Sequence, residues 1–153
     1  MTKSKDLEEI LRTEADLAEA LAGVMVQKQR SIVEFDAEQL GALTQREQDL
    51  MAPFRDLEKE RVRVAAELAS GLPGQAQTAQ EGHIQIRDLV NALEGPAGDS
   101  ISGQAARLRH AVERILNVNQ QNRILMQHSL RFVRETLRLV TNDHTRQLVD
   151  QRM

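Results

Sequence analysis

Apolar side chains recur every three or four residues over the first half of the chain and predict two long helices. We expect the first from about Ser4 to Glu34 and the second from Ala37 to about Ala69. The first helix has its core positions at Leu7, Ile10, Leu11, Leu17, Ala18, Leu21, Val24, Met25 and Ile32. The second has them at Leu40, Leu43, Glu47, Leu50, Phe54, Leu57, Arg61, Val64 and Leu68.

The boundary between these two helices carries three agreeing signals. Asp36 is a typical N-cap residue, and Gln39 follows three residues later to complete a capping box. Phe35 before the cap and Leu40 four positions after it form the pattern of a hydrophobic staple. The chain therefore turns at Phe35 and Asp36.

Two members of the second stripe, Glu47 and Arg61, are charged. Buried ions are costly unless they are paired. We therefore expect both side chains to lie at the edge of the stripe and to reach solvent.

The middle of the chain is less regular. The run Ser70-Gly71-Leu72-Pro73-Gly74 ends the second helix, and the stretch to Gly82 is typical of a polar loop. A short helix follows, and Gly95-Pro96-Ala97-Gly98 stops it. One face of this short helix carries Ile86, Leu89, Val90 and Leu93.

The last helix begins at about Asp99 and extends to Val140 or beyond. Its main stripe is Ile101, Ala105, Leu108, Val112, Ile115, Asn119, Asn122, Met126, Val133, Leu137 and Val140. A second apolar set lies off that stripe: Leu116, Ile124, Leu125, Leu130, Phe132 and Leu139. The apolar surface is thus broader than one neighbouring helix covers.

These elements predict an all-α fold, an elongated antiparallel bundle of three long helices and one short helix. At about 1.5 Å per residue, the long C-terminal helix extends past its neighbours. We expect one domain over residues 1–141 and a polar, frayed tail over residues 142–153. An apolar surface on the projecting part of the last helix requires a partner.

Composition and charge narrow the function. The chain has no cysteine and only three aromatic residues, which excludes disulfides and argues against base-stacking platforms. Residues 1–70 carry 10 Lys/Arg and 15 Asp/Glu, whereas residues 99–153 carry 9 and 5. The basic last helix complements the acidic first half, and a net charge of −3 does not indicate nucleic-acid binding.

The sequence predicts a cytoplasmic protein without membrane insertion. Its first residues are polar and lack the apolar core of a secretion signal, and no apolar run is long enough to span a membrane.

No pattern in the chain indicates an enzyme, a cofactor or a metal site. A di-iron helix bundle requires Glu-x-x-His motifs, and none occurs around His83, His110, His128 or His144. Gly-rich phosphate loops and nucleophile elbows are also missing from the sequence. We therefore expect a protein-binding function.

The segment from Asn117 to Asn122 is rich in amides, and two interpretations of it remain open. Asn119 and Asn122 are three residues apart within the main stripe. They form either a polar layer that fixes helix register in the core, or a set of hydrogen-bonding groups for a bound segment.

In several ordered features the chain resembles the FlgN-type flagellar export chaperones. The resemblance covers the opening amphipathic helix, the turn, and a second helix with Leu40, Leu43, Arg46-Glu47, Leu50, Leu57-Glu58 and Arg61. It continues in the closing helix with Leu116, Asn119-x-x-Asn122, Leu125 and Ser129-Leu130. The Asn-x-x-Asn element is its most specific part.

The resemblance implies a cytosolic chaperone of the flagellar type III export system. Such proteins bind the C-terminal helical segments of the hook–filament junction proteins, prevent premature assembly and aid delivery to the export apparatus. The C-terminal helix is the client-binding part of this family. The implied partner-binding residues are Ile115, Leu116, Asn119, Asn122, Arg123, Leu125, Met126, Leu130, Val133, Leu137 and Val140.

Two other functions fit the same helical pattern. One is a structural bundle that self-associates through its exposed stripe, and the other is a regulatory bundle that sequesters another protein. The sequence does not distinguish a client groove from a dimer interface.

Overall fold

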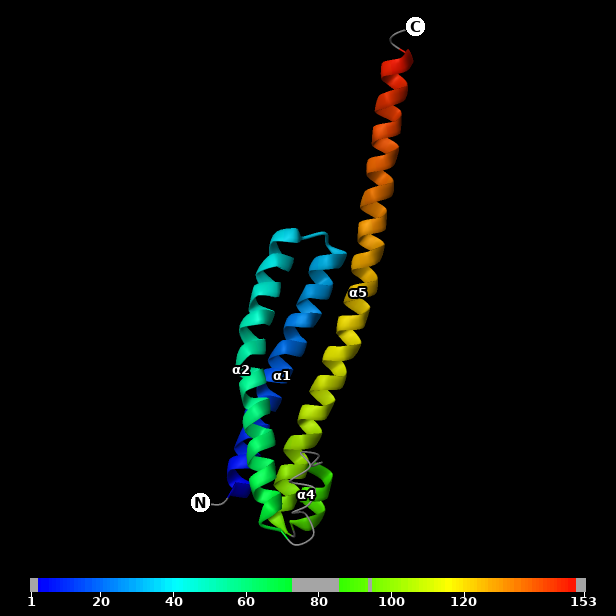
Figure 1. The fold of residues 1–153 in the computed structure, drawn as a ribbon. Coiled ribbons are helices and arrows are strands. Elements are labelled where there is room, and N and C mark those ends of the chain that lie inside the picture. Colours follow the sequence, from blue (N-terminus) through cyan, green and yellow to red (C-terminus); the bar gives the residue numbers. More distant parts are fainter. Residues whose placement is uncertain (1–2, 73–85, 94, 151–153) are drawn as a thin grey trace.

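The structure, a computed structural model, describes residues 3–72, 86–93 and 95–150. Its helices are α1 (Lys3–Val33), α2 (Ala37–Ser70), α4 (Ile86–Ala92) and α5 (Pro96–Asp150). Figure 1 shows three long helices side by side, with α4 at the end where α2 finishes and α5 begins. The predicted all-α bundle of three long helices and one short helix is confirmed. The predicted polar loop lies mostly outside the described residues.

Helix α1 is the centre of the bundle. It packs along both α2 and α5, whereas no Cα atoms of α2 and α5 approach within 8 Å of each other in the described ranges. Helix α2 runs antiparallel to α1, and α5 runs in the same direction as α1 (Figure 1). The buried positions of α1 reflect this double contact: Leu7, Leu11, Glu14, Ala15, Ala18, Leu21, Ala22, Val24, Met25, Ser31 and Ile32.

The turn between α1 and α2 forms where the sequence predicts it. The Asp36 carboxylate accepts a hydrogen bond from the Gln39 backbone N–H at 3.0 Å, as expected of an N-cap. The preceding residues form a Schellman motif, since the N–H groups of Asp36 and Phe35 donate to the carbonyls of Ser31 and Ile32. Phe35 takes the left-handed position of this motif with a φ of 55°, which is unfavourable for a bulky side chain.

The end of the bundle near α4 has a closed apolar core to which all four helices contribute. Helix α4 covers it with Leu89, which is fully buried. The fully packed cluster is Leu7, Leu11, Val64, Ala65, Ala69, Leu89 and Ile101. The opposite end, at the α1–α2 turn, has no such cover among the described residues.

The two charged members of the α2 stripe, Glu47 and Arg61, pair across the α1–α2 interface, which the sequence pattern did not predict, and both side chains still reach solvent in part. Arg61 Nε donates to Glu14 Oε2 at 3.0 Å, and Lys28 Nζ donates to Glu47 Oε2 at 2.6 Å. Only 24% of the Arg61 side chain and 23% of the Glu47 side chain are exposed. Pairing is what allows ions at these positions.

Glu14 is the most deeply buried of these ions, with a side chain only 1% exposed. Burial raises the pKa of its carboxyl group, and the Arg61 guanidinium opposes that rise. The sequence pattern did not identify Glu14 as an interior residue, because the search for buried positions considered apolar side chains and Glu14 is charged.

Helix α5 is far longer than the bundle. Its 55 residues span about 80 Å. Burial ends at Asn122, partial burial ends at Ser129, and every described side chain from Leu130 to Asn142 is exposed. The C-terminal part therefore projects beyond the α1–α2 turn (Figure 1). Residues 142–150, expected as a frayed tail, continue this helix in the structure, and both their fraying and a domain boundary at residue 141 stay predictions.

The Glu14–Arg61 pair yields an asymmetric prediction for stability. Arg61→Leu leaves the buried Glu14 carboxylate without its partner and should lower the free energy of unfolding by about 3 kcal/mol. Glu14→Leu should cost only about 1 kcal/mol, because the long Arg61 side chain can extend to water. The double variant should recover most of the loss. Urea unfolding followed by far-UV circular dichroism measures all three, and equal losses in the two single variants would contradict this account.

Candidate partner-binding surface

A continuous apolar stripe runs along the projecting part of α5. Its members are Met126, Leu130, Val133, Leu137 and Val140, spaced by four and three residues in alternation. This spacing is the repeat of helices that pack lengthwise against another helix. Met126 is half-buried where the stripe enters the bundle, while the other four are between 42% and 62% exposed. We call these five residues the α5 stripe.

Phe132 and Leu139 form a second exposed apolar line on the same helix. They are 61% and 65% exposed and lie seven residues apart, so they share one line along the helix. Contiguous exposed apolar surface of this kind commonly marks a binding site.

The base of the α5 stripe adjoins two connected hollows between α5 and the α1–α2 turn. The first has a volume of about 300 Å³ and the second about 180 Å³. Ile32, Leu40 and Met126 line both, so the hollows form one groove. The first also contacts Lys28, Thr44, Asn119, Asn122, Arg123 and Gln127, and the second Ser31, Phe35, Asp36, Ala37, Ser129, Leu130 and Val133. We call this combined feature the turn groove.

Phe35 forms one wall of the turn groove. It is 60% exposed, and its ring centroid lies 6.1 Å from that of Phe132 at an interplanar angle of 49°. Such tilted pairs are favourable aromatic contacts. The predicted staple partner Leu40 lines the same hollow, so Phe35 links the turn to both α2 and α5.

The two asparagines of the Asn-x-x-Asn element have different surroundings. Asn122 is buried with 6% exposure, and its Nδ2 donates to the Met25 carbonyl oxygen at 2.9 Å. Asn119 is exposed, and Val118 takes the inward position beside Asn122. Of the two open interpretations, a polar layer in the core therefore does not fit Asn119.

The other predicted site residues lie around the same helix. Ile115 and Leu125 are half-buried within the bundle, whereas Leu116 is 64% exposed. Arg123 is exposed and lines the turn groove. The structure thus brings six predicted residues together at the groove and places Leu116 outside it. The six are Asn119, Asn122, Arg123, Met126, Leu130 and Val133.

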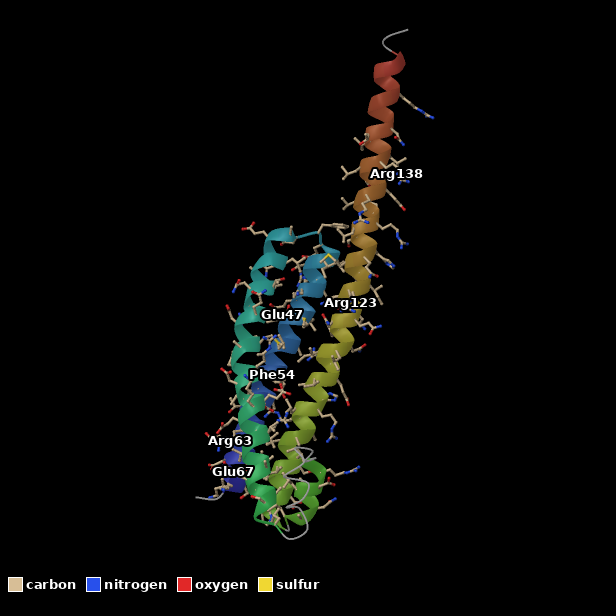
Figure 2. The ribbon with its side chains drawn as sticks, in the orientation of Figure 1. Glu47, Phe54, Arg63, Glu67, Arg123 and Arg138 are labelled. Atoms are coloured by element: carbon tan, nitrogen blue, oxygen red, sulfur yellow. The ribbon has the colours of Figure 1, made fainter. Side chains whose placement is uncertain are left out.

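Four arginines follow one edge of the α5 stripe: Arg123, Arg131, Arg134 and Arg138. Figure 2 shows Arg123 on the part of α5 beside α1 and Arg138 on the projecting part. None of the four makes an ion pair within the part of the chain that the structure describes. Arg107, lower on the same helix, contrasts with them because it pairs with Asp16 and Glu19 of α1. The unpaired arginines leave positive charge beside the stripe.

Two further features of the described residues concern metal sites and membrane spans. Across residues 3–72, 86–93 and 95–150, no three His, Asp or Glu side chains converge on a point that would hold a metal ion. No helix in these ranges is long and apolar enough to cross a membrane. The arrangement suits a second helix laid along α5.

A comparison with protein-family models decides the family. The model described as FlgN protein matches residues 1–149, nearly the whole chain. The chain belongs to the FlgN family. FlgN proteins are flagellar export chaperones, and membership assigns that general role and the binding of flagellar proteins to this chain. Searches of curated proteins and of solved structures found no match.

The structure adds members to the surface that the sequence pattern did not assign to it. Ile32, Phe35 and Leu40 come from the α1–α2 turn, and Phe132 comes from α5 itself. The staple pattern placed Phe35 and Leu40 at the turn, but only the packing of α5 beside that turn makes them part of a groove.

Proposed function

We propose that this FlgN-family chain is a cytoplasmic chaperone that binds the C-terminal helical segments of the hook–filament junction proteins along α5. One observation supports this most strongly: the α5 stripe has the spacing of a helix-pairing surface and is uncovered by the described chain. The client helix lies on the stripe and its end enters the turn groove. This is recognition of an amphipathic helix by an apolar surface.

The binding free energy comes chiefly from apolar burial. Burying a fully exposed aliphatic side chain stabilises a complex by about 1–3 kcal/mol. About half of the surface is exposed in Leu130, Val133, Leu137 and Val140, so each of them contributes about half of that free energy when the client covers it. An unassembled client terminus is disordered, so part of this gain is offset by the entropy of ordering it. A stripe of several residues is therefore needed for a stable complex.

The arginine edge supplies orientation. Charged groups at the rim of an interface influence association rate and register more than affinity. Arg131, Arg134 and Arg138 favour a client helix with acidic residues along the facing edge. Met126 at the groove adds an unbranched, adaptable side chain that can fit two related clients.

Binding along α5 would prevent premature assembly of the client. In this proposal, the client terminus that binds α5 is also the part whose early assembly must be prevented. Once α5 covers that terminus, the client stays unassembled and soluble until the export apparatus receives it.

The first test asks where on the client the chaperone binds. The protein should co-purify with each junction protein from the same cell and lose that binding when the last roughly 40 client residues, a helix long enough to span the stripe, are deleted. Light scattering should show a one-to-one complex. Binding that survives the deletion, or a chaperone that only self-associates, would contradict the proposal.

The second test compares two exposed valines. Val133→Glu places a charge in the middle of the stripe and should weaken client binding about tenfold or more, because the charge must be buried. Val62→Glu on α2 is the matched control, since Val62 is 51% exposed and Val133 is 42% exposed. Isothermal titration calorimetry measures both affinities. Thermal unfolding should show both variants within about 0.5 kcal/mol of the original protein.

If Val133→Glu binds the client as tightly as Val62→Glu does, the stripe is not the client site. If Val133→Glu unfolds the protein, the valine belongs to a core, and the exposed stripe is not a binding surface.

A further inference from the structure

Asn122 holds a polar atom whose role the fold does not explain. The Asn122 side chain is 6% exposed, and its Nδ2 donates to the Met25 carbonyl oxygen at 2.9 Å. Because a carbonyl oxygen can only accept, this bond fixes which way the amide points. The other end, Oδ1, is buried and has no hydrogen-bond partner among the described residues. A buried acceptor without a donor is unfavourable.

This acceptor belongs to a residue that lines the turn groove. Two neighbouring donors at the groove wall are engaged elsewhere: Lys28 Nζ with the Glu47 carboxylate at 2.6 Å, and Thr44 Oγ1 with the Leu40 carbonyl at 2.8 Å. Asn119, Arg123 and Gln127 also line this hollow, and none of them donates to Asn122 Oδ1. The first hollow, about 300 Å³ in volume, is large enough to admit a side chain. A segment bound in this hollow therefore lies beside Asn122.

We propose that Asn122 Oδ1 accepts a hydrogen bond from one donor side chain of the client helix and thereby fixes the client's register on α5. The donor is an amide, hydroxyl or guanidinium group set within the client's otherwise apolar face. A single buried polar contact between two otherwise apolar helices favours one register over registers in which one helix is shifted along the other. This inference rests on the proposed function and adds the chemistry by which the client is aligned.

The charges beside the groove favour a client over a second copy of the chain. Arg123, Arg131, Arg134 and Arg138 have no carboxylate partner in the described residues. Between residues 114 and 142, α5 contains one acidic residue, Glu135. Two copies joined through their stripes would therefore bring together eight such arginines and only two carboxylates. A client helix with an acidic edge pairs with these arginines.

The experiment separates a client contact from a structural polar layer. The probes are fluorescein-labelled synthetic peptides of the last 40 or so residues of the junction proteins from the same cell, long enough to span the stripe. Fluorescence anisotropy gives Kd for the original protein, for Asn122→Leu and for Asn117→Leu. Asn117 is the matched control because it is exposed on the same helix and does not line the groove.

Asn122→Leu should weaken peptide binding about tenfold, because the client donor is left buried without an acceptor. The midpoint of thermal unfolding of the free variant should change little, since removal of the unpaired Oδ1 acceptor offsets loss of the Nδ2 bond to the Met25 carbonyl. Asn117→Leu should bind as the original protein does. The polar residues of the peptide should also be replaced by leucine one at a time. At one position this replacement should raise the Kd for the original protein and leave the Kd for Asn122→Leu unchanged.

Three outcomes would overturn this inference, and they differ from one another. Unchanged affinity of Asn122→Leu, with peptide binding otherwise intact, refutes the contact and leaves the proposed function standing. A large loss of stability in Asn122→Leu assigns the amide to the core. If the original protein fails to bind any peptide, the proposed function falls and this inference falls with it.

Discussion

The double contact of α1 determines the rest of this structure. Helix α1 buries one side against α2 and another against α5, while no Cα atoms of α2 and α5 come within 8 Å of each other in the described ranges. Each outer helix therefore has only one neighbour of comparable length. A helix whose apolar surface is broader than one neighbour covers must leave part of it exposed, and α5 is such a helix.

The turn between α1 and α2 has a conformational cost that its position helps to explain. Phe35 adopts a left-handed backbone conformation that usually belongs to glycine or asparagine. Non-glycine residues held in this way commonly occur where the surrounding structure has a functional reason to keep them. Here the turn directs an aromatic ring toward Phe132, at the level where α5 leaves the bundle. The ring forms part of the groove that we assign to the client.

Much of the fold follows from hydrophobic periodicity, because long amphipathic helices give the strongest signal in a sequence. The helix boundaries and the Asp36 cap are examples. The sequence did not reveal which side of α1 meets which neighbour, and so it missed the buried Glu14 and its bond to Arg61. That contact depends on how α1 packs against α2, which no local pattern encodes.

The candidate site was less predictable than the fold. Residues three apart on a helix differ in direction by about 60° around the axis. The sequence pattern therefore assigns Asn119 and Asn122 to one apolar stripe, although the two side chains differ in exposure. The position of α1 decides between them, and it buries Asn122 alone. The groove likewise depends on two segments that are far apart in sequence, residues 28–44 and residues 119–133. The α5 stripe, by contrast, lies within one helix. The sequence predicted it because the last helix has more apolar surface than one neighbouring helix covers.

The length of α5 also affects how the particle behaves in solution. A compact domain of 153 residues has a radius of gyration of roughly 15 Å, whereas α5 alone spans about 80 Å. Such a rod-like monomer diffuses slowly and elutes early from a sizing column, where it resembles a larger globular species. Its elution volume would therefore suggest a dimer even when each particle contains a single chain.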